Sequence, residues 1–91
     1  MKPVRWTTHA RREIARREIN ADEAEKTVAK PDLVAPGNPP PRQIFMRRYF
    51  DGVLQAEMLL RVVAEESSSE IVIVTLYKTS KLKKYLGEQS R

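Results

Sequence analysis

The chain has 91 residues, no cysteine and a formal net charge of +5. This length suits one domain with a modest hydrophobic core, and the lack of cysteine excludes disulfides, thiolate metal sites and a cysteine nucleophile. No apolar run approaches the roughly 20 residues that cross a bilayer, and the N-terminus lacks the apolar core of a signal peptide. We therefore expect a single domain over residues 1–91 of a soluble cytoplasmic protein that makes no membrane contact.

The positive charge is concentrated at both ends of the chain. Residues 1–19 carry six basic and two acidic side chains, and residues 78–91 carry five basic and one acidic. Basic ends suit a nucleic acid or an acidic protein partner. The alternative is the solvated surface of a small basic protein, and charge alone leaves both interpretations open.

A brief apolar segment over residues 4–7, either a short edge strand or an extended arm, precedes the first predicted helix. Thr8 suits the N-cap position, because its hydroxyl can accept from a backbone N–H two or three residues later. The helix is predicted over residues 9–18. Within it, Glu13 and Arg16 are one turn apart and can form a salt bridge.

A second helix is predicted over residues 21–29. Asn20 and Glu23 form a capping-box pattern at its start. Pro31 ends the helix, because the residue before a proline avoids the α region. The proline-rich residues 31–41 predict a loop that crosses to the sheet.

The dipeptide Asp51-Gly52 lies between two apolar runs and predicts a two-residue, type I′ hairpin turn. This turn pairs residues whose numbers sum to 103, so that Phe45 lies opposite Met58 on the face covered by the helices. Arg48 then lies on the other face, which we expect to be open to solvent.

Residues 67–69 are three serines that predict a second turn. A three-residue loop there places Arg61 opposite Thr75, with Tyr77 on the same open face. A two-residue loop would turn the last strand over, so the choice of loop decides this placement.

Residues 71–75 are five consecutive β-branched residues. Such residues favour a pleated strand, and an apolar run on both alternating sets predicts a strand covered on both faces. A buried helical segment is the alternative, which the β-branched run disfavours.

The order of these elements predicts an α+β fold. Two N-terminal helices pack on one face of a small antiparallel sheet, and Ser80 caps a short C-terminal helix over residues 81–86 that ends at Gly87. The expected core consists of Ile14, Ile19, Val28, Met58, Leu60, Val62, Val72, Val74 and Leu76.

Several short motifs resemble a known family. They are Thr8-His9-Ala10, Arg17, Ile19, Lys30-Pro31-Asp32, Leu60-Arg61-Val62-Val63 and Val74-Thr75-Leu76-Tyr77-Lys78. Over about residues 5–80 the chain resembles the small bacterial family called domain of unknown function 4258, which is similar to the RelE/ParE toxins. The resemblance implies two helices packed on an antiparallel sheet. The chain departs from the family pattern at Glu18, where a glycine is usual, and at Glu13, where a basic residue is frequent.

Four residues are candidates for catalysis. Arg61 and Arg48 on an open sheet face can bind a phosphate and stabilise charge that develops on it. Tyr77 adjoins them, and His9 can act as a general acid or base. The alternatives are cross-strand salt bridges for the arginines and local hydrogen bonds at the helix start for His9.

Six further basic residues are candidates for nucleic-acid binding, namely Arg12, Arg16, Lys78, Lys81, Lys83 and Lys84. Exposed aromatic side chains among Trp6, Phe45, Tyr49 and Phe50 could stack bases, although their spacing is more typical of a core. With one histidine and no cysteine, we expect no metal site and no cofactor.

The resemblance leaves two main functions open. RelE-type relatives cleave messenger RNA without a metal, which implies an endoribonuclease toxin. ParE-type relatives act on gyrase, which implies a non-catalytic module that binds an acidic antitoxin or another protein. A third possibility is an inert member that binds nucleic acid weakly. We expect a monomer or weak dimer in each case.

Overall fold

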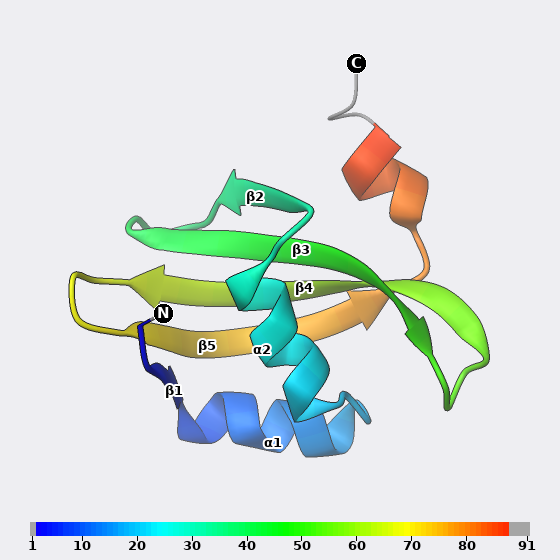
Figure 1. Cartoon of the computed structure of the whole chain (residues 1–91), viewed down its shortest axis with the longest axis horizontal. Helices are drawn as coiled ribbons and strands as arrows, with labels where there is room; N and C mark the ends of the chain where they lie inside the picture. The colour runs from blue at the N-terminus through cyan, green and yellow to red at the C-terminus, as the bar shows by residue number, and fades with distance from the viewer. Residues whose placement is uncertain (1, 88–91) are drawn as a thin grey trace.

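The computed structural model describes residues 2–87, in which two helices are followed by the long strands of a sheet (Figure 1). In chain order the elements are β1 (Val4–Trp6), α1 (Thr8–Arg16), α2 (Ala21–Ala29), β2 (Leu33–Pro36), β3 (Arg42–Asp51), β4 (Ala56–Glu66), β5 (Ile71–Thr79) and the π-helical turn η1 (Lys83–Gly87). The α+β class is therefore confirmed. Within the described residues no helix is long and apolar enough to span a bilayer.

The sheet has five strands in the order β1-β5-β4-β3-β2, and it is mixed rather than antiparallel. β1 runs parallel to β5, while the other neighbours are antiparallel. The parallel pair extends beyond β1, because Thr7 N donates to Ile73 O at 3.1 Å. The predicted antiparallel sheet was therefore too small, and the possible edge strand over residues 4–7 forms a parallel pair that was not predicted.

β2 lies within the segment that was predicted to be a loop. It pairs with β3 from Leu33 opposite Met46 to Pro36 opposite Gln43. Pro36 has no N–H to donate, and the strand tolerates it because it is the last residue of an edge strand. The prediction of a loop over residues 31–41 was wrong for these four residues.

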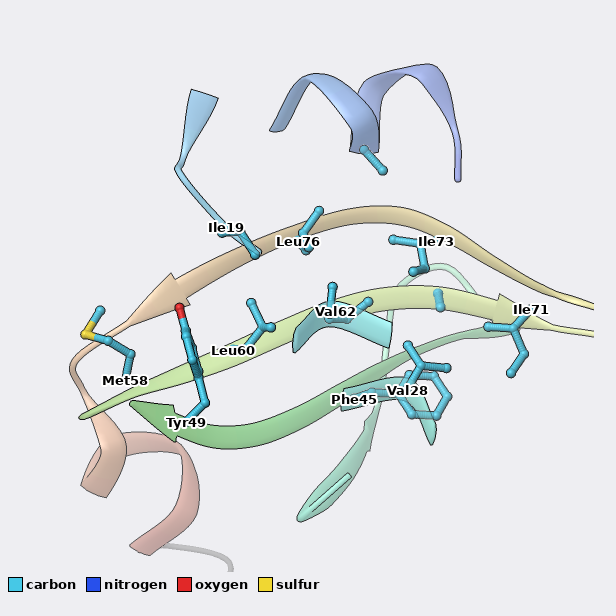
Figure 2. Packing of buried hydrophobic residues seen from close by; sticks show 13 residues of the cluster. Ile19, Val28, Phe45, Tyr49, Met58, Leu60, Val62, Ile71, Ile73 and Leu76 are labelled. Atoms are coloured by element: carbon cyan, nitrogen blue, oxygen red, sulfur yellow. The ribbon is translucent and has the colours of Figure 1, made fainter. Parts of the chain in front are cut away.

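Both helices bury side chains against the same face of the sheet. Figure 2 shows this core, in which Ile19 and Val28 from the helical segment meet Leu60 and Val62 of β4. Of the nine predicted core residues, six are buried, namely Ile19, Val28, Met58, Leu60, Val62 and Leu76.

A β-bulge explains why Val72 and Val74 are only half-buried. Val63 pairs with Thr75 and the next residue of β4 pairs with Ile73, so Val74 has no partner of its own. The extra residue reverses the alternation of side chains along the first half of β5. Ile71 and Ile73 are therefore buried in place of the two valines.

The hairpin between β3 and β4 has a longer loop than expected. Asp51 pairs with Ala56, and Tyr49 lies opposite Met58 rather than Leu54. The Asp51 carboxylate accepts from the backbone N–H groups of the second and third loop residues, at 2.9 and 3.0 Å. These bonds favour a four-residue loop, in which Gln55 adopts a φ of 54°.

The helix starts are well capped. Thr7 rather than Thr8 caps α1, because its Oγ1 accepts from Ala10 N at 3.0 Å. Asn20 caps α2 as predicted, accepting from two backbone N–H groups. The carboxylate of Glu23 bonds to Arg47 at 2.6 Å, which gives that arginine a partner at the rim of the helix-covered face.

Candidate functional site

The open face is the face of the sheet opposite α1 and α2, and Arg61 of β4 lies near its middle. Arg61 is opposite Met46 of β3 and Tyr77 of β5. The predicted pairing of Arg61 with Thr75 was therefore wrong by two residues. The predicted pairing between β3 and β4 was wrong by four residues, since Met58 lies opposite Tyr49 instead of Phe45. Because both errors are even, Arg48, Arg61 and Tyr77 still share one face.

The Arg61 guanidinium is held by uncharged partners. One Nη1–H donates to the hydroxyl oxygen of Tyr77, and Nε lies 3.4 Å from Met46 Sδ. These contacts use two of the five N–H donors of arginine and leave three. No carboxylate within residues 2–87 forms a salt bridge with Arg61. The guanidinium group therefore has no neutralising carboxylate in these residues and has three N–H donors left for an external anion.

Tyr85 of η1 completes the cluster, and the sequence prediction had not assigned it to a site. Its ring centroid is 4.0 Å from Arg61 Cζ, and the Tyr77 ring is 5.4 Å away. Figure 2 shows the C-terminal turn on the opposite side of the sheet from α1. The turn therefore partly covers a face that was expected to be open.

The pKa values of Tyr77 and Tyr85 are shifted in opposite directions. Burial, followed by the hydrogen bond to Tyr85, raises the pKa of Tyr77 above that of a free tyrosine. The same hydrogen bond lowers the pKa of Tyr85. Tyr77 therefore carries its proton throughout the neutral range.

Arg48 is exposed on the same face, closer to the β3–β4 loop. Its side chain is 59% exposed, and Nη1 lies 4.0 Å from the equally exposed Glu57 carboxylate. Its backbone N–H donates to Asp32 at 2.9 Å, which ties β3 to the residue before β2. An exposed pair at this distance contributes little to stability.

His9 lies at the edge of the sheet, in the first turn of α1. Its Nε2 is 3.3 Å from Thr75 Oγ1. Thr75 and Tyr77 are alternate residues of β5 and point to the same face. His9 thus lies beside the open face, while the structure does not bring it into contact with Arg61.

The arginines of α1 differ from one another. Arg16 donates to both carboxylate oxygens of Glu13, at 3.1 and 2.8 Å, which confirms the predicted salt bridge. The hydrogen bonds from Arg16 and then Arg17 lower the pKa of Glu13 to about 2. Arg12 is exposed and has no salt bridge within the described residues.

Lys78 points to the helix-covered face rather than toward Arg61. Its Nζ donates to Asp51 at 2.7 Å and to the backbone carbonyl of Glu18 at 3.0 Å. The Tyr49 hydroxyl donates to the same Asp51 oxygen at 3.0 Å. The hydrogen bond from Lys78 lowers the pKa of Asp51 to about 2. This cluster ties three elements together, so Lys78 does not adjoin the open-face site.

The lysines of the C-terminal segment remain available to a partner. Lys81, Lys83 and Lys84 are exposed, and Lys84 Nζ is 5.3 Å from the Tyr85 ring centroid. None of the three forms a salt bridge within the part of the chain that the structure describes.

The aromatic candidates separate into core and surface. Phe45 and Tyr49 are buried, and Trp6 is half-buried with its Nε1 donating to Glu25 at 3.1 Å. Phe50 is exposed. Among the described residues, no three His, Cys, Asp or Glu side chains are grouped to hold a metal ion.

A family model described as a domain of unknown function, DUF4258, matches residues 6–78. The chain belongs to the DUF4258 family. No curated protein and no solved structure matched the chain. The DUF4258 match includes Arg48, Arg61, Tyr77 and His9, whereas Tyr85 and the three exposed lysines lie beyond it.

Proposed function

We propose that this DUF4258 protein binds RNA on its open face and cleaves the RNA backbone without a metal, as RelE-type toxins do. The observation that carries the proposal is Arg61, a half-buried arginine with three unused N–H donors and no carboxylate partner in the described residues. Arginine keeps its charge at any working pH and presents a rigid fork of donors that matches a phosphate.

The proposed reaction is an internal transesterification. The ribose 2′-oxygen attacks phosphorus and loses its proton to a base, and the bond from phosphorus to the 5′-oxygen breaks. The products are a 2′,3′-cyclic phosphate and a 5′-hydroxyl, which gains a proton from an acid. Arg61 stabilises the negative charge that develops on the phosphoryl oxygens.

Tyr77 and His9 are the candidate acid and base. Tyr77 is the candidate acid because its hydroxyl group contacts Arg61 and so lies beside the proposed phosphate position. His9, beside Thr75, is the candidate acceptor of the 2′-hydroxyl proton. Arg48 and the lysines of the C-terminal segment bind flanking phosphates.

The likeness to RelE/ParE toxins is also part of the proposal. It is supported by the chain order, in which two helices precede β3, β4 and β5, and by the packing of both helices on one face. Fold alone does not fix activity, so the proposal depends on the Arg61 cluster rather than on this likeness.

A second candidate is a non-catalytic, ParE-like module that binds an acidic antitoxin. It is favoured by the exposed lysines Lys81, Lys83 and Lys84, which have no carboxylate partner in the described residues and could receive acidic side chains.

Inducible expression tests the first candidate against the second. We expect the wild-type chain to arrest growth and to shorten messenger RNA lifetimes. Arg61→Ala should abolish both effects, while Arg42→Ala should preserve them, because Arg42 already pairs with Glu65 at 3.0 Å. Growth arrest with intact RNA would favour the binding module. Full activity in a folded Arg61→Ala variant would remove the proposed site.

A further inference from the structure

Phe50 is an exposed aromatic residue on a strand whose other aromatic residues are buried. It lies near the end of β3 and is 63% exposed, whereas Phe45 and Tyr49 belong to the core. Phe50 and Arg48 are alternate residues of β3, so both side chains project from the open face. Arg48 is also largely exposed, at 59%.

We infer that Phe50 and Arg48 form a stacking position for an unpaired base of single-stranded RNA, at one end of the open face. This inference rests on the proposed function and names its substrate class. The Phe50 ring offers a free aromatic surface to a base, and Arg48 offers a cation to the adjacent phosphate.

Charge and geometry favour this occupant. Arg48 lies two residues from Phe50, about 7 Å along the strand, and Arg61 lies further along the same face. A row with one aromatic ring followed by two arginines is the arrangement with which proteins bind single strands, by stacking the bases and attracting the backbone.

Base stacking on a side chain selects unpaired RNA. In a duplex each base is stacked between its neighbours, and the A-form major groove is too narrow for side chains to read. Away from the duplex ends, a ring projecting from a sheet can stack only on a base that has left the helix. The site should therefore prefer a single strand to a duplex of the same sequence.

Glu57 is an unfavourable neighbour. It lies opposite Phe50 and 4.0 Å from Arg48, and its carboxylate is 58% exposed. A phosphate bound to Arg48 must displace this weak pair and approach a negative charge. Glu57→Gln should consequently strengthen the binding of single-stranded RNA. The binding of an acidic protein partner would also become stronger, so this variant does not distinguish the two partners.

Val53 provides a matched control for Phe50. It lies in the adjoining loop and is 64% exposed, close to the value for Phe50, but has no aromatic ring. An apolar protein partner would contact both residues, together with Leu54. Only a stacked base would discriminate between them.

The experiment measures the binding of a 2′-O-methyl oligonucleotide, which cannot be cleaved because it lacks the nucleophile. Fluorescence anisotropy gives affinities for the single strand and for its blunt duplex. Phe50→Ala should weaken single-strand binding by about 5-fold or more, with duplex binding unchanged. Val53→Ala should change neither affinity.

A tryptophan provides a direct readout of stacking. In Phe50→Trp the affinity should be retained, and saturation with the single strand should quench fluorescence beyond the quenching seen in the wild type. Equal losses in Phe50→Ala and Val53→Ala, or unchanged single-strand affinity in Phe50→Ala, would overturn the inference.

The two proposals fail in different ways. If the wild type binds the single strand and Arg61→Ala weakens binding while Phe50→Ala does not, only the stacking position is wrong. If the wild type binds neither oligonucleotide at low salt, the proposed RNA function fails and the stacking position fails with it.

Discussion

Glu18 adopts a left-handed backbone conformation, with a φ of 54°, just after Arg17, the C-cap residue of α1. Such a conformation costs an L-residue with a Cβ roughly 1–2 kcal/mol, and glycine avoids this cost. The resemblance to the DUF4258 family implies a glycine at this position, and the left-handed backbone gives a physical reason for that expectation. The backbone carbonyl of Glu18 accepts a hydrogen bond from Lys78 Nζ at 3.0 Å, which holds the turn in place.

Glu18→Gly should therefore stabilise the protein. Part of the gain is offset by the greater freedom of glycine in the unfolded chain. We therefore expect the Glu18→Gly variant to have a free energy of unfolding about 1 kcal/mol higher than that of Glu18→Ala, which also lacks the glutamate side chain but keeps a Cβ. Urea denaturation of both variants measures the difference. Equal midpoints for glycine and alanine would show that the turn is not strained.

Asp51 should make the protein sensitive to acid. Its pKa is lowered to about 2, below the usual 3.8, chiefly by the hydrogen bond from Lys78. Because the folded pKa is the lower one, the unfolded chain binds more protons between these values. The stabilisation is present above about pH 4 and is lost as the pH falls toward 2.

Asp51→Asn should remove this contribution, since asparagine does not titrate. The difference in unfolding free energy between wild type and variant should be largest above pH 4 and should narrow as the pH falls to 2. Urea titrations across pH 2–6 test this expectation. A constant difference over that range would contradict it.

At the scale of elements, the bulge in β5 decides which side chains form the core. Ile73 is fully buried, whereas Val74 has no partner of its own in β4 and is half-buried. Ile73→Ala should cost about 2–5 kcal/mol through lost burial and the remaining cavity, and Val74→Ala clearly less. Thermal or urea unfolding measures the loss of stability in each variant. A larger loss in Val74→Ala than in Ile73→Ala would place the bulge elsewhere.

The faces of the long strands could be predicted from the sequence, while their exact pairing could not. Alternation of apolar residues fixed which side chains of β3 and β4 face the helices, and errors of two and four residues preserve that alternation. The four-residue loop depends on hydrogen bonds that Asp51 makes to the loop backbone. The bulge at Val74 and the strand β2 have no distinct local signal.

The candidate site was predictable only in part. Arg61, Arg48 and Tyr77 share a face because of strand alternation alone. Tyr85 approaches Arg61 from a segment whose position depends on the path of the chain after β5. Lys78 directly follows Tyr77, so strand alternation already turns it to the helix-covered face, where Asp51 accepts its hydrogen bond.

Across the described residues, several basic side chains on the helix side form salt bridges, while Arg11, Arg12, Lys26 and Lys30 there form none. Arg16 pairs with Glu13, Arg47 with Glu23, and Lys78 with the buried Asp51. Lys81, Lys83 and Lys84 have no such partner within residues 2–87. Both sides therefore carry basic residues without a salt bridge, and the proposed RNA site predicts that the three lysines of the C-terminal turn are the ones that contact phosphates.

Salt dependence tests whether the lysines of the C-terminal turn contact phosphates. Each phosphate contact with a single strand contributes about 0.7 to the slope of log affinity against log salt. If Lys81, Lys83 and Lys84 each contact a phosphate, replacing all three by alanine should reduce the magnitude of the slope by up to about 2. Weaker binding without a change in slope would place the phosphate contacts elsewhere.

The matched control removes the same amount of charge from the helical side. Arg11, Lys26 and Lys30 are all exposed on α1, α2 or the residue after α2. Replacing these three by alanine gives the same net charge as the first triple variant, but should leave the slope almost unchanged, because they lie away from the open face. Equal slopes for the two triple variants would mean that RNA responds to net charge rather than to a defined face. Anisotropy titrations of the 2′-O-methyl single strand between 50 and 200 mM salt, about the range over which phosphate contacts reduce affinity steeply, measure both slopes.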